Sequence, residues 1–236
     1  MRARWFAFLA IVLVASCACS GVPIGFAHHA PTPYYVQDTS PSALDLTLVV
    51  FMQGTEPFTP SPTTSIEVYF SVPGHLIAFH GGETLACNGA APMTLGNKYV
   101  TLKYPTAAVA GKPFACVYTS RGHTAQIQAH LPPAPQLLSP TQGATVLRQA
   151  ALLVTYRDIS GKAEIDAFSG ANIPPEDTSV KITTPGSMTI DTTNFTAGPG
   201  RIEIDETPAV RVLSTGGFHS FIVQPNAFAE AQVTWV

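Results

Sequence analysis

Charged side chains are scarce in this sequence of 236 residues, because Asp, Glu, Lys and Arg together make up only 11% of it. An intrinsically disordered chain combines high net charge with few apolar groups, whereas 46% of the residues here are apolar. Long helical and coiled-coil proteins are rich in Glu, Lys and Arg, so the composition disfavours that class too. The formal net charge of −3 makes the chain mildly acidic, and such a chain does not attract nucleic acid or an anionic membrane surface.

The motifs of common enzyme classes are also missing. The sequence contains no Gly-x-Ser-x-Gly elbow, no His-Glu-x-x-His helix and no glycine-rich phosphate loop of the Walker or Gly-x-Gly-x-x-Gly type. We therefore expect a protein that is not an enzyme and needs no cofactor. A secreted hydrolase whose site these motifs miss is retained as an alternative.

Only one long hydrophobic run occurs, and it lies at the N-terminus. Residues 1–19 begin with Arg2 and Arg4, continue through an almost wholly apolar stretch from Trp5 to Ala15, and end at Cys19. A basic start followed by roughly 7–15 apolar residues is typical of a signal peptide, whereas a transmembrane helix needs about 20. We predict an export signal at residues 1–19 and a tether at residues 20–42, which are rich in Pro, Gly, Ser and Thr.

The end of the apolar stretch reads Val14-Ala15-Ser16-Cys17. An aliphatic residue, two small residues and a cysteine at this place resemble a bacterial lipobox. In lipoproteins of that type the cysteine is lipidated and becomes the mature N-terminus, so the resemblance implies a lipid anchor on Cys17. The protein would then lie on the outer face of the cytoplasmic membrane or at the cell surface.

A second cleavage point follows Ala27, because Gly25 and Ala27 put small residues at the −3 and −1 positions. Cleavage there would give a secreted chain that begins with His28 and His29. An N-terminal histidine can chelate copper through its amino group and imidazole, an arrangement that resembles the copper site of small periplasmic copper-binding sandwiches. If Cys17 is lipidated instead, both histidines are tether residues.

Two cysteines, Cys87 and Cys116, lie beyond the export segment. An even pair in an oxidising compartment predicts a disulfide bond. Under the chain-entropy model, closing a loop of about 30 residues adds roughly 3 kcal/mol to stability. The alternative is a metal-binding pair, but neither cysteine lies in a Cys-x-x-Cys motif.

Apolar and polar residues alternate along most of the remaining chain. Leu44, Leu46, Leu48 and Val50, for example, recur with the period of two that is typical of a half-buried strand. The 21 prolines and 18 glycines are spread along the chain, as frequent turns require. No segment after the export signal has helical periodicity, so we expect an all-β protein. Further strands are predicted at residues 65–72, 75–79, 84–87, 99–104, 114–119, 124–131, 152–156, 163–168, 180–183, 187–190, 201–205, 210–213, 218–223 and 233–235.

The segment Pro132-Pro133-Ala134-Pro135 separates the predicted strands into two halves, each of which approaches the roughly 100 residues of a sandwich domain. The stretch from Pro135 to Val146 resembles the opening strand of bacterial immunoglobulin-like and fibronectin-III-like modules, and Val233-Thr234-Trp235 resembles their closing strand. We therefore predict two tandem antiparallel immunoglobulin-like β-sandwich domains after the signal segment, at residues 43–132 and 133–236.

Potential metal ligands form two groups. His75, His80, Glu83 and Cys87 have side chains that zinc accepts, but an odd spacing directs His75 and His80 to opposite faces of a strand. Surface histidines beside a turn are the simpler interpretation. Together with His28 and His29, these residues support an exported copper- or zinc-binding protein as the alternative function.

The second group is acidic. Calcium takes six to eight oxygen ligands, and no Asp-x-Asp-x-Asp-Gly loop is present, so we expect a solvated acidic sheet face instead. Glu203 and Asp205 share one strand face. The residues of this group are Asp166, Asp191, Glu203, Asp205 and Glu206.

Tyrosines are the candidates for contact with a protein or carbohydrate ligand, because Tyr is large, rigid and amphipathic. They are Tyr34, Tyr35, Tyr69, Tyr104 and Tyr118. Loops at residues 52–63 and 169–179 are expected to carry further contacts. The sequence thus predicts an exported, lipid-anchored, non-catalytic module that binds a partner or acts as a spacer at the cell surface.

Overall fold

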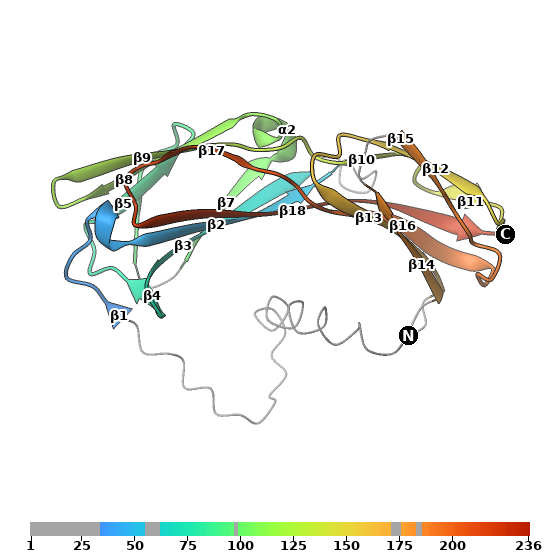
Figure 1. Ribbon diagram of the computed structural model, residues 1–236, viewed down its shortest axis with the longest axis horizontal. Helices are drawn as coiled ribbons and strands as arrows, with labels where there is room; N and C mark the ends of the chain where they lie inside the picture. Colours follow the sequence, from blue (N-terminus) through green and yellow to red (C-terminus); the bar gives the residue numbers. More distant parts are fainter. Residues whose placement is uncertain (1–33, 55–61, 97–98, 171–175, 183–185) are drawn as a thin grey trace, which may run out of the picture. The chain divides into compact units, whose positions relative to one another are not determined.

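The computed structural model describes residues 34–54, 62–96, 99–170, 176–182 and 186–236 (Figure 1). The predicted export signal with Cys17, and the tether up to residue 33 with His28 and His29, lie outside the described residues. The all-β prediction is confirmed, since helical structure in the described part is limited to η1 (Pro41–Ala43) and α2 (Thr106–Val109). No helix within these ranges is long and apolar enough to cross a membrane.

Most strands follow the predicted segments, with ends that differ by a few residues and with some additions, and β18 joins two of those segments. They are β1 (Tyr34–Tyr35), β2 (Asp45–Gln53), β3 (Thr63–Val72), β4 (His75–Ala78), β5 (Thr84–Cys87), β6 (Met93–Thr94), β7 (Val100–Pro105), β8 (Pro113–Ser120), β9 (His123–His130), β10 (Gln136–Ser139), β11 (Ala144–Val146), β12 (Leu152–Arg157), β13 (Lys162–Ser169), β14 (Glu176–Ile182), β15 (Gly186–Ile190), β16 (Gly198–Thr207), β17 (Arg211–Thr215) and β18 (Ser220–Trp235).

The described strands form three sheets. The largest is ten-stranded, with the order β1-β4-β3-β2-β18-β16-β13-β14, and β7 and β11 pair with β3 and β18. A five-stranded sheet, β17-β9-β8-β5-β6, and a three-stranded sheet, β10-β12-β15, complete the fold. In Figure 1 these two smaller sheets lie on the same side of the ten-stranded sheet.

Alternating burial explains why the strands pack in this way. On β2, Leu46, Leu48 and Val50 are buried while Asp45 and Thr47 are only partly covered. Because successive side chains point to opposite faces, one face of β2 enters the core and the other stays at the surface. The predicted inward set on β9 (Ala125, Ile127, Ala129, with Leu131 following) is buried as well.

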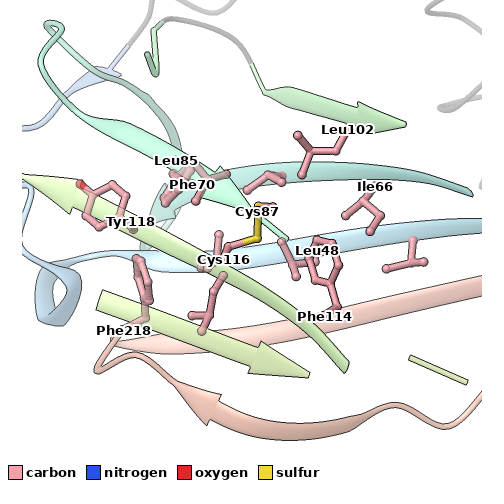
Figure 2. Packing of buried hydrophobic residues seen from close by; sticks show 14 of the residues in the cluster. Leu48, Ile66, Phe70, Leu85, Cys87, Leu102, Phe114, Cys116, Tyr118 and Phe218 are labelled. Atoms are coloured by element: carbon pink, nitrogen blue, oxygen red, sulfur yellow. A yellow bond between two sulfur atoms is a disulfide. The ribbon is translucent and has the colours of Figure 1, made fainter. Parts of the chain in front are cut away.

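The first hydrophobic core lies between the five-stranded sheet and one half of the ten-stranded sheet, a layered pair that we call the first sandwich. Leu48 and Ile66 come from the larger sheet, and Phe114 and Tyr118 from the smaller one (Figure 2). Cys87 and Cys116 face each other across β5 and β8 within this core and form the predicted disulfide, with their Cα atoms 4.0 Å apart. Such a bond indicates an oxidising, extracytoplasmic environment.

The second core, in what we call the second sandwich, lies between the three-stranded sheet and the other half of the ten-stranded sheet. Ile165 and Ile204 of the larger sheet and Val154 of the smaller one belong to this core. Trp235 closes this core: its ring packs edge-on to Phe195, and its indole N–H donates a hydrogen bond of 2.8 Å to the carbonyl of Phe168. The buried polar end of the tryptophan is therefore paired, as burial requires.

Strand β18 belongs to both sandwiches. Its residues 220–228 pair with β2, and its residues 227–235 pair with β16 (Figure 1). We predicted two separate strands at 218–223 and 233–235, but the intervening residues continue the alternation, with Ala227, Ala229 and Ala231 buried. Residues 211–215 and 220–228, which follow the predicted domain boundary, pair with β9 and β2 from the first half.

The expected antiparallel pairing holds for most neighbours but not for all. β18 runs parallel to both β2 and β11, and β1 runs parallel to β4. A tight hairpin imposes antiparallel pairing, whereas strands that are far apart in sequence can meet in either direction. The partners β2 and β18 are separated by more than half of the chain, so no turn dictates their direction.

At Gly54 the backbones of the two halves approach each other closely. The N–H of Gly54 donates a hydrogen bond of 2.6 Å to the carbonyl of Phe228 on β18. A Cβ atom on Gly54 would lie 2.2 Å from the carbonyl oxygen of Pro135, in the segment that joins the halves. Only glycine therefore fits between β18 and this segment.

Gly54→Ala is expected to lower the free energy of unfolding by about 1–3 kcal/mol, because the methyl group overlaps the backbone at Pro135 and Phe228. Urea-induced unfolding measures the change. Gly96→Ala serves as the control, since a Cβ there would meet nothing within 4 Å. Equal stability of the Gly54 variant and the wild type would contradict the close approach.

Candidate functional site

The ten-stranded sheet has a gap along one edge of β3. β3 pairs with β7 from Thr63 to Val68 and with β4 at Ser71 and Val72. No described strand therefore pairs with Tyr69 and Phe70 on that edge. A cavity of about 190 Å³ lies at this place.

The cavity extends from the surface toward the first core. Phe70, Phe79 and Leu95 line it and are buried, whereas Leu76 and Tyr99 line it and are exposed. Tyr69 and Phe70 contribute from opposite faces of β3, because neighbouring residues of a strand point in opposite directions. The lining is apolar apart from the tyrosine hydroxyl groups and the backbone. Its residues are Tyr69, Phe70, Leu76, Ile77, Phe79, Leu95 and Tyr99.

Two tyrosines form one wall of the cavity. The rings of Tyr69 and Tyr99 stack with their centroids 5.2 Å apart. The hydroxyl of Tyr69 donates a hydrogen bond of 2.5 Å to the carboxylate of Glu67. Burial, followed by this hydrogen bond and the negative charge of Glu67, raises the pKa of Tyr69, so its hydroxyl stays protonated and keeps donating.

Further aromatic side chains lie beside the cavity. β1 pairs with β4 through Tyr34–Ile77 and Tyr35–Ala78, next to the lining residues. Tyr34 stacks on His75 with centroids 4.8 Å apart, and Tyr35 stacks on His80 at 4.5 Å. Four exposed residues are called the tyrosine rim below: Leu76 and Tyr99, which line the cavity, and Tyr34 and Tyr35 on β1, which pairs with β4.

The structure does not bring the predicted zinc ligands together. His75 and His80 stack on different tyrosines, and Cys87 is bonded to Cys116. Glu83 is fully buried. Among the described residues, no group of three or more His, Cys, Asp or Glu side chains is arranged to hold a metal ion.

The carboxylate of Glu83 is buried without a hydrogen bond. No described residue donates to either of its oxygens. The guanidinium of Arg121 approaches to 3.9 Å, but 59% of the Arg121 side chain is exposed, so the charge on Glu83 is weakly compensated. Burial of a charged group without partners destabilises a fold.

The predicted acidic sheet face exists on the second sandwich, with a somewhat different membership. Asp166 on β13 pairs with Glu203 on β16, and Glu203 pairs in turn with Glu230 on β18. Glu164 on β13 pairs with Asp205 on β16. Partial burial, with repulsion from Glu203, Asp166 and Glu164, raises the pKa of Asp205 to about 6, although Arg201 opposes the shift. Arg201 pairs with Glu203 at 3.1 Å and lies over the ring of Phe168.

The other two predicted members lie elsewhere. Glu206 points into the second sandwich and accepts hydrogen bonds from the N–H groups of Ser160 and Gly161 and from the Ser160 hydroxyl. Its pKa is raised because burial outweighs these bonds. Asp191 accepts two hydrogen bonds from Thr193 at the surface, which lower its pKa.

The remaining ligand candidates are scattered. Tyr104 packs edge-on to Phe114, and Tyr118 is buried, donates to the carbonyl of Thr39 and has its pKa raised to about 12 by burial. Of the predicted contact loops, residues 55–61 and 171–175 lie outside the described residues, and β2 and β14 contain several of the others. Sequence reasoning missed Tyr99, Leu76 and Leu95, because only the gap beside β3 brings them together.

The sequence matches no protein-family model, and no curated protein matches it significantly.

The two buried glutamates are expected to respond oppositely to replacement by methionine, which has a similar size. Glu83→Met should raise the free energy of unfolding by about 1–2 kcal/mol, because it removes a buried carboxylate that accepts no hydrogen bond from the described residues and has only a distant ion pair with the exposed Arg121. Glu206→Met should lower it by about 2–4 kcal/mol, because three donors lose their acceptor. Chemical unfolding at pH 7 checks both variants, and a loss of stability in Glu83→Met would contradict the account of that residue.

The raised pKa of Asp205 makes the free energy of unfolding depend on pH. Its raised pKa means that the folded state binds the proton more tightly than the unfolded state, so this group costs stability above pH 6 and the cost disappears below about pH 4. Asp205→Asn should therefore raise the free energy of unfolding at pH 7 by up to about 1 kcal/mol, after solvent screening of this exposed group, and leave it unchanged at pH 3.5.

Unfolding titrations at pH 7 and pH 3.5 measure the difference between Asp205→Asn and the wild type. Asp191→Asn is the matched control, because hydrogen bonds lower the pKa of Asp191 and its loss should reduce stability at pH 7. If both asparagine variants changed stability in the same direction at pH 7, repulsion on the acidic face would not be the cause.

Proposed function

We propose that this protein is an extracytoplasmic, non-catalytic binding module with two immunoglobulin-like sandwiches, held at the membrane by a lipid on Cys17. The observation that carries the binding role is the exposure of the tyrosine rim beside a cavity. Leu76 is 65% exposed, Tyr99 50%, Tyr34 47% and Tyr35 44%. Large apolar groups that gather at one exposed place mark interaction sites, and tyrosine is favoured there.

The architecture supports presentation of this surface. β18 pairs with strands of both sandwiches, so a backbone ladder joins them in addition to the segment around Pro135. A module built in this way acts as a spacer and carries its contact surface at a fixed place on the first sandwich. The disulfide between Cys87 and Cys116 and the predicted export signal agree with a place outside the cytoplasm.

The proposed address is tested by the intact mass of the mature protein from membrane and soluble fractions of its native host. A lipid-modified N-terminus at Cys17 in the membrane fraction is the expected result. An unmodified chain that starts at His28 in the soluble fraction would refute the anchor and would favour copper binding through His28 and His29.

The binding role is tested by capture from an envelope extract with the mature protein and two exposed leucine variants. Leu76→Ser alters the tyrosine rim, and Leu147→Ser is the control, since Leu147 is 68% exposed but lies outside the rim. We expect a partner that wild type and Leu147→Ser retain equally and that Leu76→Ser loses at least about tenfold. Equal capture by all three proteins would contradict a role of the rim.

A further inference from the structure

The cavity beside β3 has the size of a single ring. Its volume is about 190 Å³. An engineered apolar protein cavity of about 150 Å³ binds benzene, whereas sites for whole drug-sized ligands span roughly 300–1,000 Å³. Since protein interiors are close-packed, an open space of this size beside a core is available to one six-membered ring and its substituent.

The lining determines what kind of ring fits. Phe70, Phe79 and Leu95 form the buried part, where no side chain offers a hydrogen bond. The stacked pair of Tyr69 and Tyr99 forms a wall, and offset stacking is the arrangement in which aromatic rings attract one another. A charged ring would lose its hydration here without compensation, so the lining favours a neutral one.

The hydrogen bond between Tyr69 and Glu67 adds a polar preference. The hydroxyl hydrogen of Tyr69 is directed to the Glu67 carboxylate, so the hydroxyl oxygen of Tyr69 is left as an acceptor. The carboxylate of Glu67 is also an acceptor. A ligand therefore matches the Tyr69 side of this wall when it brings a donor of its own, and the negative charge of Glu67 disfavours an anion.

We infer that the cavity binds a neutral single-ring group that carries an O–H or N–H donor, of the phenol type, with the donor directed to the hydroxyl oxygen of Tyr69. The inference rests on the binding role proposed above and names the ligand chemistry of the same site. The exposed positions of Leu76 and Tyr99 leave the cavity open to a small molecule from solution.

Phenol and toluene provide a matched test, because they have the same shape and only phenol has a donor. Toluene is the more apolar of the two and would bind more tightly to a cavity without a polar partner. NMR titration of the full mature protein with each probe is expected to give phenol a dissociation constant on the order of 1 mM, equal to or tighter than that of toluene.

Tyr69→Phe identifies the acceptor. The variant keeps the ring and its stacking on Tyr99, so toluene binding should stay within about twofold of the wild type. Phenol binding should weaken about three- to tenfold, which is the effect of one lost hydrogen bond. Leu147→Ser, on the second sandwich, should bind both probes like the wild type.

Three results would overturn the inference: tighter binding of toluene than of phenol by the wild type, the same loss for both probes in Tyr69→Phe, or no binding of either probe at 10 mM, roughly tenfold above the expected constant. None of these results decides the proposed function, which depends on the separate capture experiment with Leu76→Ser. Conversely, phenol binding with no capture at the rim would retain the cavity as a small-molecule site and refute a macromolecular partner.

Discussion

The pairing of β18 with two different sets of strands is the constraint on which the rest of this structure depends. Residues 220–228 complete the sheet of the first sandwich beside β2, and residues 227–235 provide a central strand of the second beside β16. Side chains alternate without interruption, and Ala227, Ala229 and Val233 enter the cores in turn. A slip of one residue would turn this whole inward set to the surface, so one register serves both cores.

The same sheet creates the candidate site. Because β4 and β7 both pair along one edge of β3, each covers only part of it, and Tyr69 and Phe70 lie between them. Phe70 faces the first core, where it packs on Phe79 and Tyr118, while Tyr69 stacks on Tyr99 at the surface. An opening in a sheet edge thus exposes aromatic groups that a complete edge would cover, which connects the fold to the proposed binding role.

The buried glutamates of the two sandwiches differ in the hydrogen bonds that their carboxylates accept. Glu206 receives three hydrogen bonds from Ser160 and Gly161, which compensate much of its desolvation. Glu83 lies near the cavity, because its backbone carbonyl accepts a hydrogen bond from the N–H of Leu95, which lines the cavity. The carboxylate of Glu83 receives no hydrogen bond from the described residues. Proteins tolerate such costs more often beside functional sites than elsewhere, so the position of Glu83 agrees with a site in the first sandwich.

Much of the fold could be predicted from the sequence, because the period of side-chain alternation is a local property. It identified most strands, the inward residues of β2 and β9, and the near absence of helix, and the cysteine count predicted the bond between Cys87 and Cys116. The same local reasoning grouped Glu203 with Asp205 on one strand face and selected tyrosines as candidate contact residues. It also included Glu206 in the acidic group, although the strand period puts Glu206 on the opposite, buried face.

Only the tertiary structure decided which strands become neighbours. Local pattern cannot show that residues 220–228 pair in parallel with β2, since the two segments are far apart in the chain and no turn joins them. For the same reason the cavity could not be predicted: Tyr69, Leu76, Leu95 and Tyr99 meet because β4 and β7 pair with β3 on either side of Tyr69 and Phe70 and leave these two residues uncovered. The sequence by itself determined the strands and their inward faces, and long-range pairing determined the site.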